Sequence, residues 1–457
     1  MQIPPGCVII TLYSARRRRL VAKVYPSIIC SAILTVLTTA CAVSGLPQIE
    51  PTATVPGPTS VKPTQIANLP TTMTAPSPTR APTTSDGIIT LSVWMVEDVA
   101  PSDTPAGKVL LNQINAFSAQ SPSIRLELAT KLASGKGGLL DFLETTRAVV
   151  PARLPDVIAL EMAQVPLAAG EGILQPLDSW LPADVTGDWF PFAVQAARYQ
   201  NHWMAVPFAA DIQHLVYNKA AVRRVPQTWN DFLSQKGTLL LPLGGDDAFL
   251  LQYLAQGVPF LDTNNQVALD GNATAQVLSF LKRAHDQGLI PESALSLKSV
   301  DQVWPGFAAG QVSMAQVSAS RYLMERSKSS NYLYAPMPTR EGKVATLSTG
   351  WAFAVVTSDP ARQAASMQFI RWITQGEHLA PWLRADHLLP ASRSAVPLAV
   401  DPPDYAGFIS DELEHASSLP SASSYATQAE AWRSAIAAVW KGQMTPEQAA
   451  RTAVAAK

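Results

Sequence analysis

Cysteine is nearly absent from this chain of 457 residues. Its three cysteines, Cys7, Cys30 and Cys41, all lie within the first 41 positions. The sequence after Cys41 therefore cannot form an internal disulfide, a cysteine metal cage or a thiolate nucleophile.

Charge is also scarce, since only 15% of residues are Asp, Glu, Lys or Arg and the formal net charge is −1. No basic patch of the nucleic-acid-binding type follows the N-terminal region, so we expect no nucleic-acid partner. The six histidines form no H-E-x-x-H or H-x-H pair, and the chain has neither a G-x-S-x-G turn nor a phosphate-binding glycine loop. We therefore expect no metal and no cofactor.

The first 41 residues have the order of a secretory signal peptide. Arg16 to Arg19 and Lys23 supply positive charge, Ile28 to Leu37 is apolar, and Thr38 to Ala40 are small residues. The apolar part is shorter than the roughly 20 residues that a membrane-spanning helix needs. The pattern predicts export, with a single membrane anchor as the alternative.

Cys41 follows the small residues directly, and this arrangement resembles the lipobox of bacterial lipoproteins. Thr38 stands where that family prefers leucine. The resemblance implies that Cys41 is acylated and becomes the mature N-terminus, which would hold the protein at the extracellular face of the cytoplasmic membrane. Release as a secreted or periplasmic protein is the alternative.

A tether rich in proline and threonine follows, from residue 42 to residue 86. Between Pro51 and Asp86, 8 of 36 residues are proline and 10 are threonine. Such a segment has little apolar surface to bury, so the composition predicts a disordered, solvated linker.

From Gly87 to Lys457 the chain is long enough to form two lobes. Hydrophobic patterns predict strands and helices in alternation, which indicates an α/β fold with parallel strand pairing. The predicted strands are Ile88 to Met95, Ser123 to Ala129 and Pro155 to Leu160, and the predicted helices are Pro105 to Ser118 and Leu139 to Val149. Ligands of such sheets bind beyond the carboxyl ends of the strands, which directs attention to Asp98 and Glu161.

The segment from His202 to Lys219 reads HWMAVPFAADIQHLVYNK. With Val206-Pro207, Asp211 and Tyr217 to Lys219 in this order, it resembles the hinge-crossing segment of bacterial extracellular solute-binding protein family 1, the maltose-type sugar-binding lipoproteins of ABC importers. Further segments match that family in order: Pro155 to Val157, Leu174 to Trp180, Pro226 to Phe232, Phe307 to Gly310 with Met314, Pro336 to Pro338, Ser348 to Trp351 and Leu389 to Ala391.

The resemblance implies a two-lobed periplasmic-binding-protein-like fold whose discontinuous lobes are joined by hinge strands. Lobe one would comprise about 87–206 and 346–382, and lobe two about 207–345 and 383–457. It also implies that the protein is not an enzyme, captures a small solute, most often a carbohydrate, by hinge closure, and delivers it to ABC permease subunits. We expect a monomer.

Asp211, Trp432 and Tyr322 carry over from the resemblance, whereas Glu161 and Asp98 come from their positions after strands. Asp211 would contact ligand hydroxyls, or else form a hinge hydrogen bond. Trp351, after the hinge glycine, would stack on a sugar face, or else pack in the core. Trp432 would stack on a sugar, or else anchor a helix face, and Tyr322 falls near an aromatic residue of the family. Glu161 and Asp98 would face the cleft, with a solvated loop acid as the alternative for Glu161.

The residues leave one enzymatic alternative open, a secreted glycoside hydrolase that uses Glu161 and Asp211 as paired carboxylates. Two local expectations concern structure alone. Thr228 should cap the helix that begins at Trp229, and Gly350 should stand where the hinge needs a positive φ or a close backbone approach.

Overall fold

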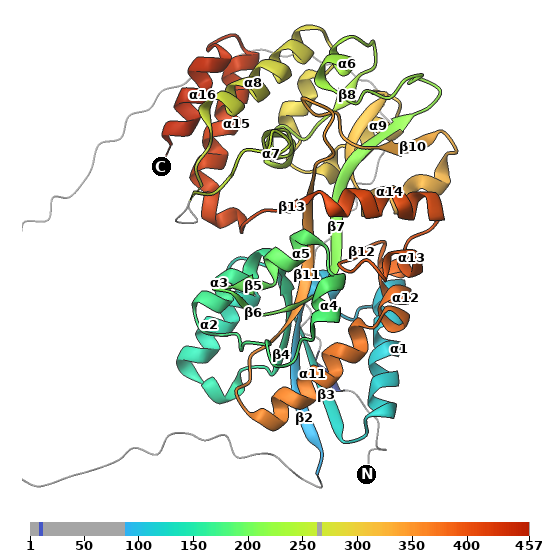
Figure 1. Cartoon of the computed structure of the whole chain (residues 1–457), viewed down its shortest axis with the longest axis vertical. Helices are drawn as coiled ribbons and strands as arrows, with labels where there is room; N and C mark the ends of the chain where they lie inside the picture. The colour runs from blue at the N-terminus through green and yellow to red at the C-terminus, as the bar shows by residue number, and fades with distance from the viewer. Residues whose placement is uncertain (1–8, 12–86, 263–266, 457) are drawn as a thin grey trace, which may run out of the picture. The chain divides into compact units, whose positions relative to one another are not determined.

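The computed structural model describes residues 9–11, 87–262 and 267–456 (Figure 1). The predicted signal peptide, acylated cysteine and tether therefore lie outside the described residues, except for Ile9–Thr11. Those three residues form β1, which pairs in parallel with residues Glu127 to Ala129 of β3. Among the described residues, no helix is both long enough and apolar enough to cross a bilayer.

The strands of the larger sheet lie along both lobes, and β5 with β6 forms a separate hairpin. Their bounds are β1 (Ile9–Thr11), β2 (Ile89–Val96), β3 (Ile124–Lys131), β4 (Val157–Glu161), β5 (Arg198–Tyr199), β6 (His202–Trp203), β7 (Val206–Asn218), β8 (Leu239–Leu240), β9 (Met314–Ser318), β10 (Tyr332–Ala335), β11 (Thr346–Val355), β12 (Leu389–Pro390) and β13 (Ala416–Ser418).

The α-helices surround these strands. Their bounds are α1 (Pro105–Gln120), α2 (Leu139–Val149), α3 (Val165–Gly170), α4 (Ala183–Asp188), α5 (Pro191–Ala196), α6 (Trp229–Leu233), α7 (Asp247–Leu254), α8 (Gly271–Asp286), α9 (Trp304–Ala308), α10 (Ala319–Glu325), α11 (Pro360–Thr374), α12 (Gly376–Asp386), α13 (Val396–Ala399), α14 (Pro403–Glu414), α15 (Ala426–Trp440) and α16 (Pro446–Ala455).

Lobe one is built as the sequence predicts. β2 pairs in parallel with both β3 and β4, and the helices α1 and α2 occupy the predicted positions between these strands. Four consecutive residues of β4, Val157 to Leu160, are fully buried, because helices cover both faces of a parallel sheet. The expected α/β alternation with parallel pairing is confirmed.

Two long strands, β7 and β11, run through both lobes (Figure 1). They pair antiparallel from Val206–Phe353 to Ile212–Ser348. Beyond Ile212, β7 pairs with β9 and β10 of lobe two, whereas Trp351 to Val355 of β11 pair on their other side with β4 of lobe one. The predicted forward crossing near His202 to Lys219 and the return crossing near Ser348 to Trp351 therefore coincide with two neighbouring strands.

The expected end of lobe one near Trp382 falls inside a helix. α12 continues to Asp386 and packs on α1, and β12 then pairs with Ala209 and Ala210 of β7. The residues up to Pro390 therefore still pack against elements of lobe one.

Two local expectations can be compared with the structure directly. The Thr228 hydroxyl accepts from the backbone N–H of Asp231, whose carboxylate accepts from the backbone N–H of Thr228, so the predicted cap is present as a capping box. Gly350 does not have a positive φ but lies in close backbone contact. A Cβ there would lie 2.6 Å from the Ala209 carbonyl oxygen and 2.9 Å from Cε of Met162.

We predict that Gly350→Ala destabilises the protein, because the added methyl group must push β7 and β11 apart. The cost should be about 1–3 kcal/mol of the free energy of unfolding, as for other overpacked sites. Urea denaturation of the purified protein measures it. Gly407→Ala is the matched control, because Gly407 lies within α14 with nothing inside 4 Å of its added Cβ. Equal midpoints for the two variants would contradict the proposed close approach.

Candidate functional site

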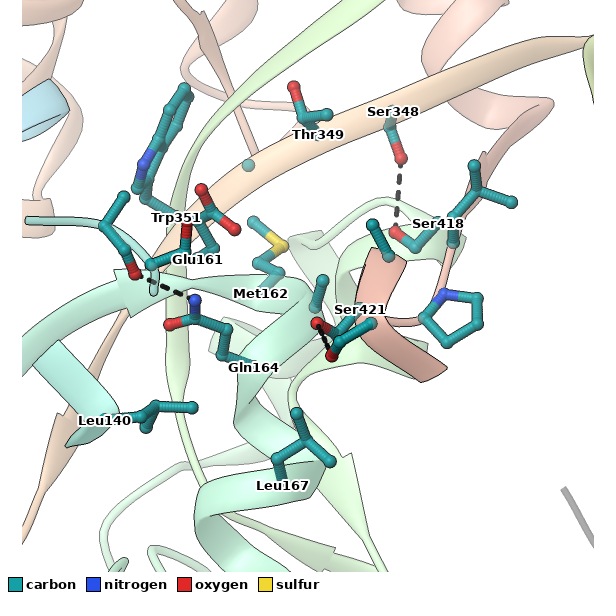
Figure 2. A pocket seen from close by; sticks show the side chains of 18 of the residues that line it. Leu140, Glu161, Met162, Gln164, Leu167, Ser348, Thr349, Trp351, Ser418 and Ser421 are labelled. Atoms are coloured by element: carbon teal, nitrogen blue, oxygen red, sulfur yellow. Dashed lines mark hydrogen bonds between the residues drawn. The ribbon is translucent and has the colours of Figure 1, made fainter. Parts of the chain in front are cut away.

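A cavity of about 540 Å³ lies where the two lobes meet the crossing strands (Figure 2). Its volume is within the range of small-molecule binding sites, roughly 300–1,000 Å³. Residues after β3 and around the end of β4 line it from lobe one, and residues of β11 line it from the hinge. Asp247 and the serine-rich segment from Ser418 to Ser423 line it from lobe two. The lining includes the polar and aromatic residues Glu161, Gln164, Asp247, Ser348, Trp351 and Tyr425.

Of the six candidate ligand-binding residues, Glu161 and Trp351 line this cavity. They are directly opposite in the register of β4 and β11, and both side chains are partly exposed. Burial raises the pKa of the Glu161 carboxyl, and the negative charge of Asp98 raises it further. The pair places an aromatic face beside a hydrogen-bond acceptor.

Two polar atoms on this cavity have no hydrogen-bond partner among the described residues. One is the indole Nε1 of Trp351, a donor, and the other is Oε1 of Gln164, an acceptor. The Gln164 side chain is held in place because its Nε2 donates to the Ala133 carbonyl at 2.9 Å. Buried polar groups normally have partners, so these two atoms are unsatisfied in this conformation and would gain from a polar partner if the side chains moved toward a ligand.

Asp247 enters the cavity from lobe two, at the first residue of α7. Its Oδ2 accepts from Nε2 of Gln213 at 2.7 Å, and Oε1 of Gln213 accepts from Nε2 of Gln316 at 2.6 Å. Burial raises the pKa of Asp247, although the hydrogen bond from Gln213 lowers it. Sequence reasoning missed this acid, because no family motif surrounds Asp246-Asp247.

The serine-rich segment reaches the cavity through β13. β13 pairs in parallel with β11, and the hydroxyls of Ser348 and Ser418 lie 3.2 Å apart. Ser421 and Ser423 follow, with their hydroxyls 3.1 Å apart (Figure 2). These hydroxyls form a polar rim that no sequence motif indicated.

Asp211 faces a different direction from the one implied by the family resemblance. Its Oδ1 accepts from the backbone N–H groups of Ile212, at 2.9 Å, and Ser320, at 3.1 Å, and its Oδ2 accepts from the Ser320 hydroxyl. Burial raises the pKa of Asp211 to about 6, against these hydrogen bonds, which lower it. Asp211 therefore joins β7 to the first turn of α10 and does not line the cavity, which favours its alternative as a hinge hydrogen bond.

Trp432, Tyr322 and Asp98 also lie outside the lining. Trp432 is fully buried, and its ring stacks on Phe249 with the centroids 5.3 Å apart. Tyr322 is buried against the rings of His214 and Tyr405. Asp98 is exposed in the short turn after β2. In this conformation the two aromatic rings offer no face to a ligand, so the structural alternative describes both.

The hydrolase alternative needs two carboxylates that face one substrate. Of Glu161 and Asp211, only Glu161 lines the cavity, and Asp211 is hydrogen-bonded to Ser320.

Among residues 9–11, 87–262 and 267–456, no group of three or more His, Cys, Asp and Glu side chains could hold a metal ion.

Comparison with known proteins gives a family. The family model described as bacterial extracellular solute-binding protein matches residues 141–408, more than half of the chain. A maltotriose-binding protein from Pyrococcus abyssi (strain GE5 / Orsay) is 26% identical over 154 residues, which span 31% of this chain and 33% of the relative. The chain thus matches only about a third of that relative's length.

Solved structures support the fold. The cyclic alpha-maltosyl-1,6-maltose binding protein from Arthrobacter globiformis superposes with a TM-score of 0.66 at 19% identity, covering 80% of this chain and 97% of its own. The sugar-binding protein MalE from Xanthomonas citri superposes with a TM-score of 0.67 at 21% identity, covering 80% and 95%. Both likenesses confirm the two-lobed periplasmic-binding-protein-like fold.

Proposed function

This chain belongs to the bacterial extracellular solute-binding proteins, and we propose that it captures a saccharide in the cavity between its lobes for an ABC importer. The family assignment makes it a binding protein rather than an enzyme, which removes the hydrolase alternative. The observation that carries the proposal is the cavity itself, which Trp351 lines on the hinge strand β11 and acids line from both lobes. The sugar ligands named for the relative and the two solved structures support the saccharide.

We propose that Trp351 stacks on a sugar ring while Glu161, Gln164 and the serine rim bond its hydroxyl groups. A sugar ring has an apolar face that can stack on Trp351 and hydroxyl groups at its edge that can donate to Glu161 and Gln164. A linear polyol has the hydroxyl groups but no such face. Stacking and hydrogen bonds to both lobes form together only when the lobes approach each other. Ligand binding would therefore shift the population toward a closed form about β7 and β11.

Trp351→Ala should weaken saccharide binding about ten- to a hundredfold, because it removes a buried aromatic face of roughly 1.5–3 kcal/mol. A thermal-shift screen with neutral sugars, amino sugars and polyols identifies the ligand, and isothermal titration measures the affinity. Trp180→Ala is the matched control, because Trp180 is also partly exposed but does not line the cavity. Unchanged affinity in Trp351→Ala would reject the cavity as the site.

Asp211→Asn, measured in the same titration, distinguishes a ligand contact of Asp211 from a hinge hydrogen bond. If Asp211 only joins β7 to α10, its replacement should weaken binding far less than Trp351→Ala does. A loss as large as that of Trp351→Ala would instead restore Asp211 as a contact of the ligand.

We propose further that Cys41 carries lipid, and that the segment from 42 to 86 tethers the solute-binding domain near ABC permease subunits. The support is the order of charged, apolar and small residues before Cys41 and the composition after it. In the native host, Cys41→Ser should move the protein from the membrane fraction to the soluble fraction. Cys30→Ser, a change of the same kind inside the apolar stretch, should leave it at the membrane. Equal membrane association of both variants would contradict lipidation at Cys41.

A further inference from the structure

The lining of the cavity carries negative charge only. Glu161 and Asp141 come from lobe one and Asp247 from lobe two, and none of the described residues that line the cavity is Lys, Arg or His. Asp141 is exposed, and its Oδ2 accepts from the backbone N–H of Gly137 at 2.7 Å. Glu161 and Asp247 are partly buried, so their charges are the ones that a bound ligand would cover.

Basic side chains of the segments next to the lining residues do not line the cavity. Arg433 bonds Asp246 and Glu430, and it lies outside the lining of the cavity. Nζ of Lys131 lies over the rings of Trp94 and Phe142, at 4.3 Å and 4.1 Å from their centroids. Lys136 stands between the lining residues Gly135 and Gly138, but it is exposed and lies outside the lining, so none of these three side chains supplies a counter-charge inside the cavity.

Gln164 gives a second, independent indication of the ligand's chemistry. The side chain is 5% exposed, lines the cavity, and leaves Oε1 without a partner. A buried acceptor of this kind needs a donor, and the Glu161 carboxylate and Oδ1 of Asp247 can accept further hydrogen bonds. The cavity therefore presents acceptors from both lobes, and among its described lining residues the Trp351 indole nitrogen is the one buried donor without a partner.

We propose that the preferred solute is a saccharide with a protonated amine, whose ammonium group bonds Glu161 and Asp247 across the closing lobes. This inference rests on the proposed function and narrows its ligand. An ammonium group offers three donors and a positive charge, and charge-assisted hydrogen bonds are roughly twice as strong as neutral ones. A neutral sugar would offer the two carboxylates hydroxyl hydrogen bonds but no opposite charge, and an anionic sugar would be repelled. The raised pKa of each acid is what burial without a cationic partner produces.

The test compares glucosamine and its β-1,4 disaccharide with glucose, cellobiose and maltose, by isothermal titration at about pH 7, where amines of this kind are mostly protonated. At least one amine-bearing sugar should bind about tenfold or more tightly than every neutral sugar. N-acetylation of the same disaccharide, which removes the charge and keeps the ring, should abolish that advantage.

Glu161→Gln and Asp247→Asn should each reduce the ratio of amine-bearing to neutral affinity by about tenfold, because each removes one charge and keeps the shape. Asp184→Asn is the control, since it removes one exposed acid of lobe one that does not line the cavity, and it should leave the ratio unchanged.

Three results would overturn the inference. Tightest binding of a neutral sugar rejects the amine and leaves the proposed function intact. An unchanged ratio in Glu161→Gln and Asp247→Asn shows that the amine is bound elsewhere. Binding of no saccharide at all, with or without an amine, rejects the proposed function and this inference together.

Discussion

The antiparallel pairing of β7 with β11 is the constraint on which the rest of the structure depends. Each strand belongs to the sheets of both lobes, so a single ladder fixes how the lobes can rotate and where the cavity lies. At its centre, Gly350 lies against the Ala209 carbonyl, at a distance that a side chain would obstruct. One step on, the register shifts between Trp351 and Ala352, which marks an irregularity of the kind that reorients a side chain.

The chemistry of the cavity follows from this crossing. Because β4 pairs with β11, its last residue Glu161 lies beside Trp351, and Gln164 follows shortly after on the same side of the cavity. Because β13 pairs with β11, it carries the serine-rich segment to the opposite wall. The result is a cavity that Trp351 lines and whose charged lining residues, in the described part of the chain, are all acidic; these residues come from segments that lie far apart in the sequence.

Sequence patterns predicted the features that depend on local chemistry or on position along a strand. The first strands and helices, the cap at Thr228 and the position of Glu161 follow from periodicity, capping chemistry and strand ends, whereas Trp351 was located through the family resemblance of the segment from Ser348 to Trp351. Trp432 could not be placed in this way, because a helix residue faces the core or the cleft according to packing against Phe249, which lies far away in the sequence. Asp211 was identified on the right strand, but its partner Ser320 is 109 residues away. The positions of Asp247 and the serine rim beside the cavity depend on how lobe two packs against β11, and no local sequence pattern predicts that packing.

The central claim, that a saccharide closes the lobes about β7 and β11, is tested most directly by a distance between the lobes. Lys136 and Thr427 are exposed, belong to opposite lobes and lie outside the lining of the cavity. With the three native cysteines replaced by serine, cysteines at these two positions would be the only ones to carry a donor and an acceptor dye. The energy-transfer efficiency should rise when a bound saccharide saturates the site, because the two labels approach each other. Saturated binding with no change in transfer would contradict hinge closure.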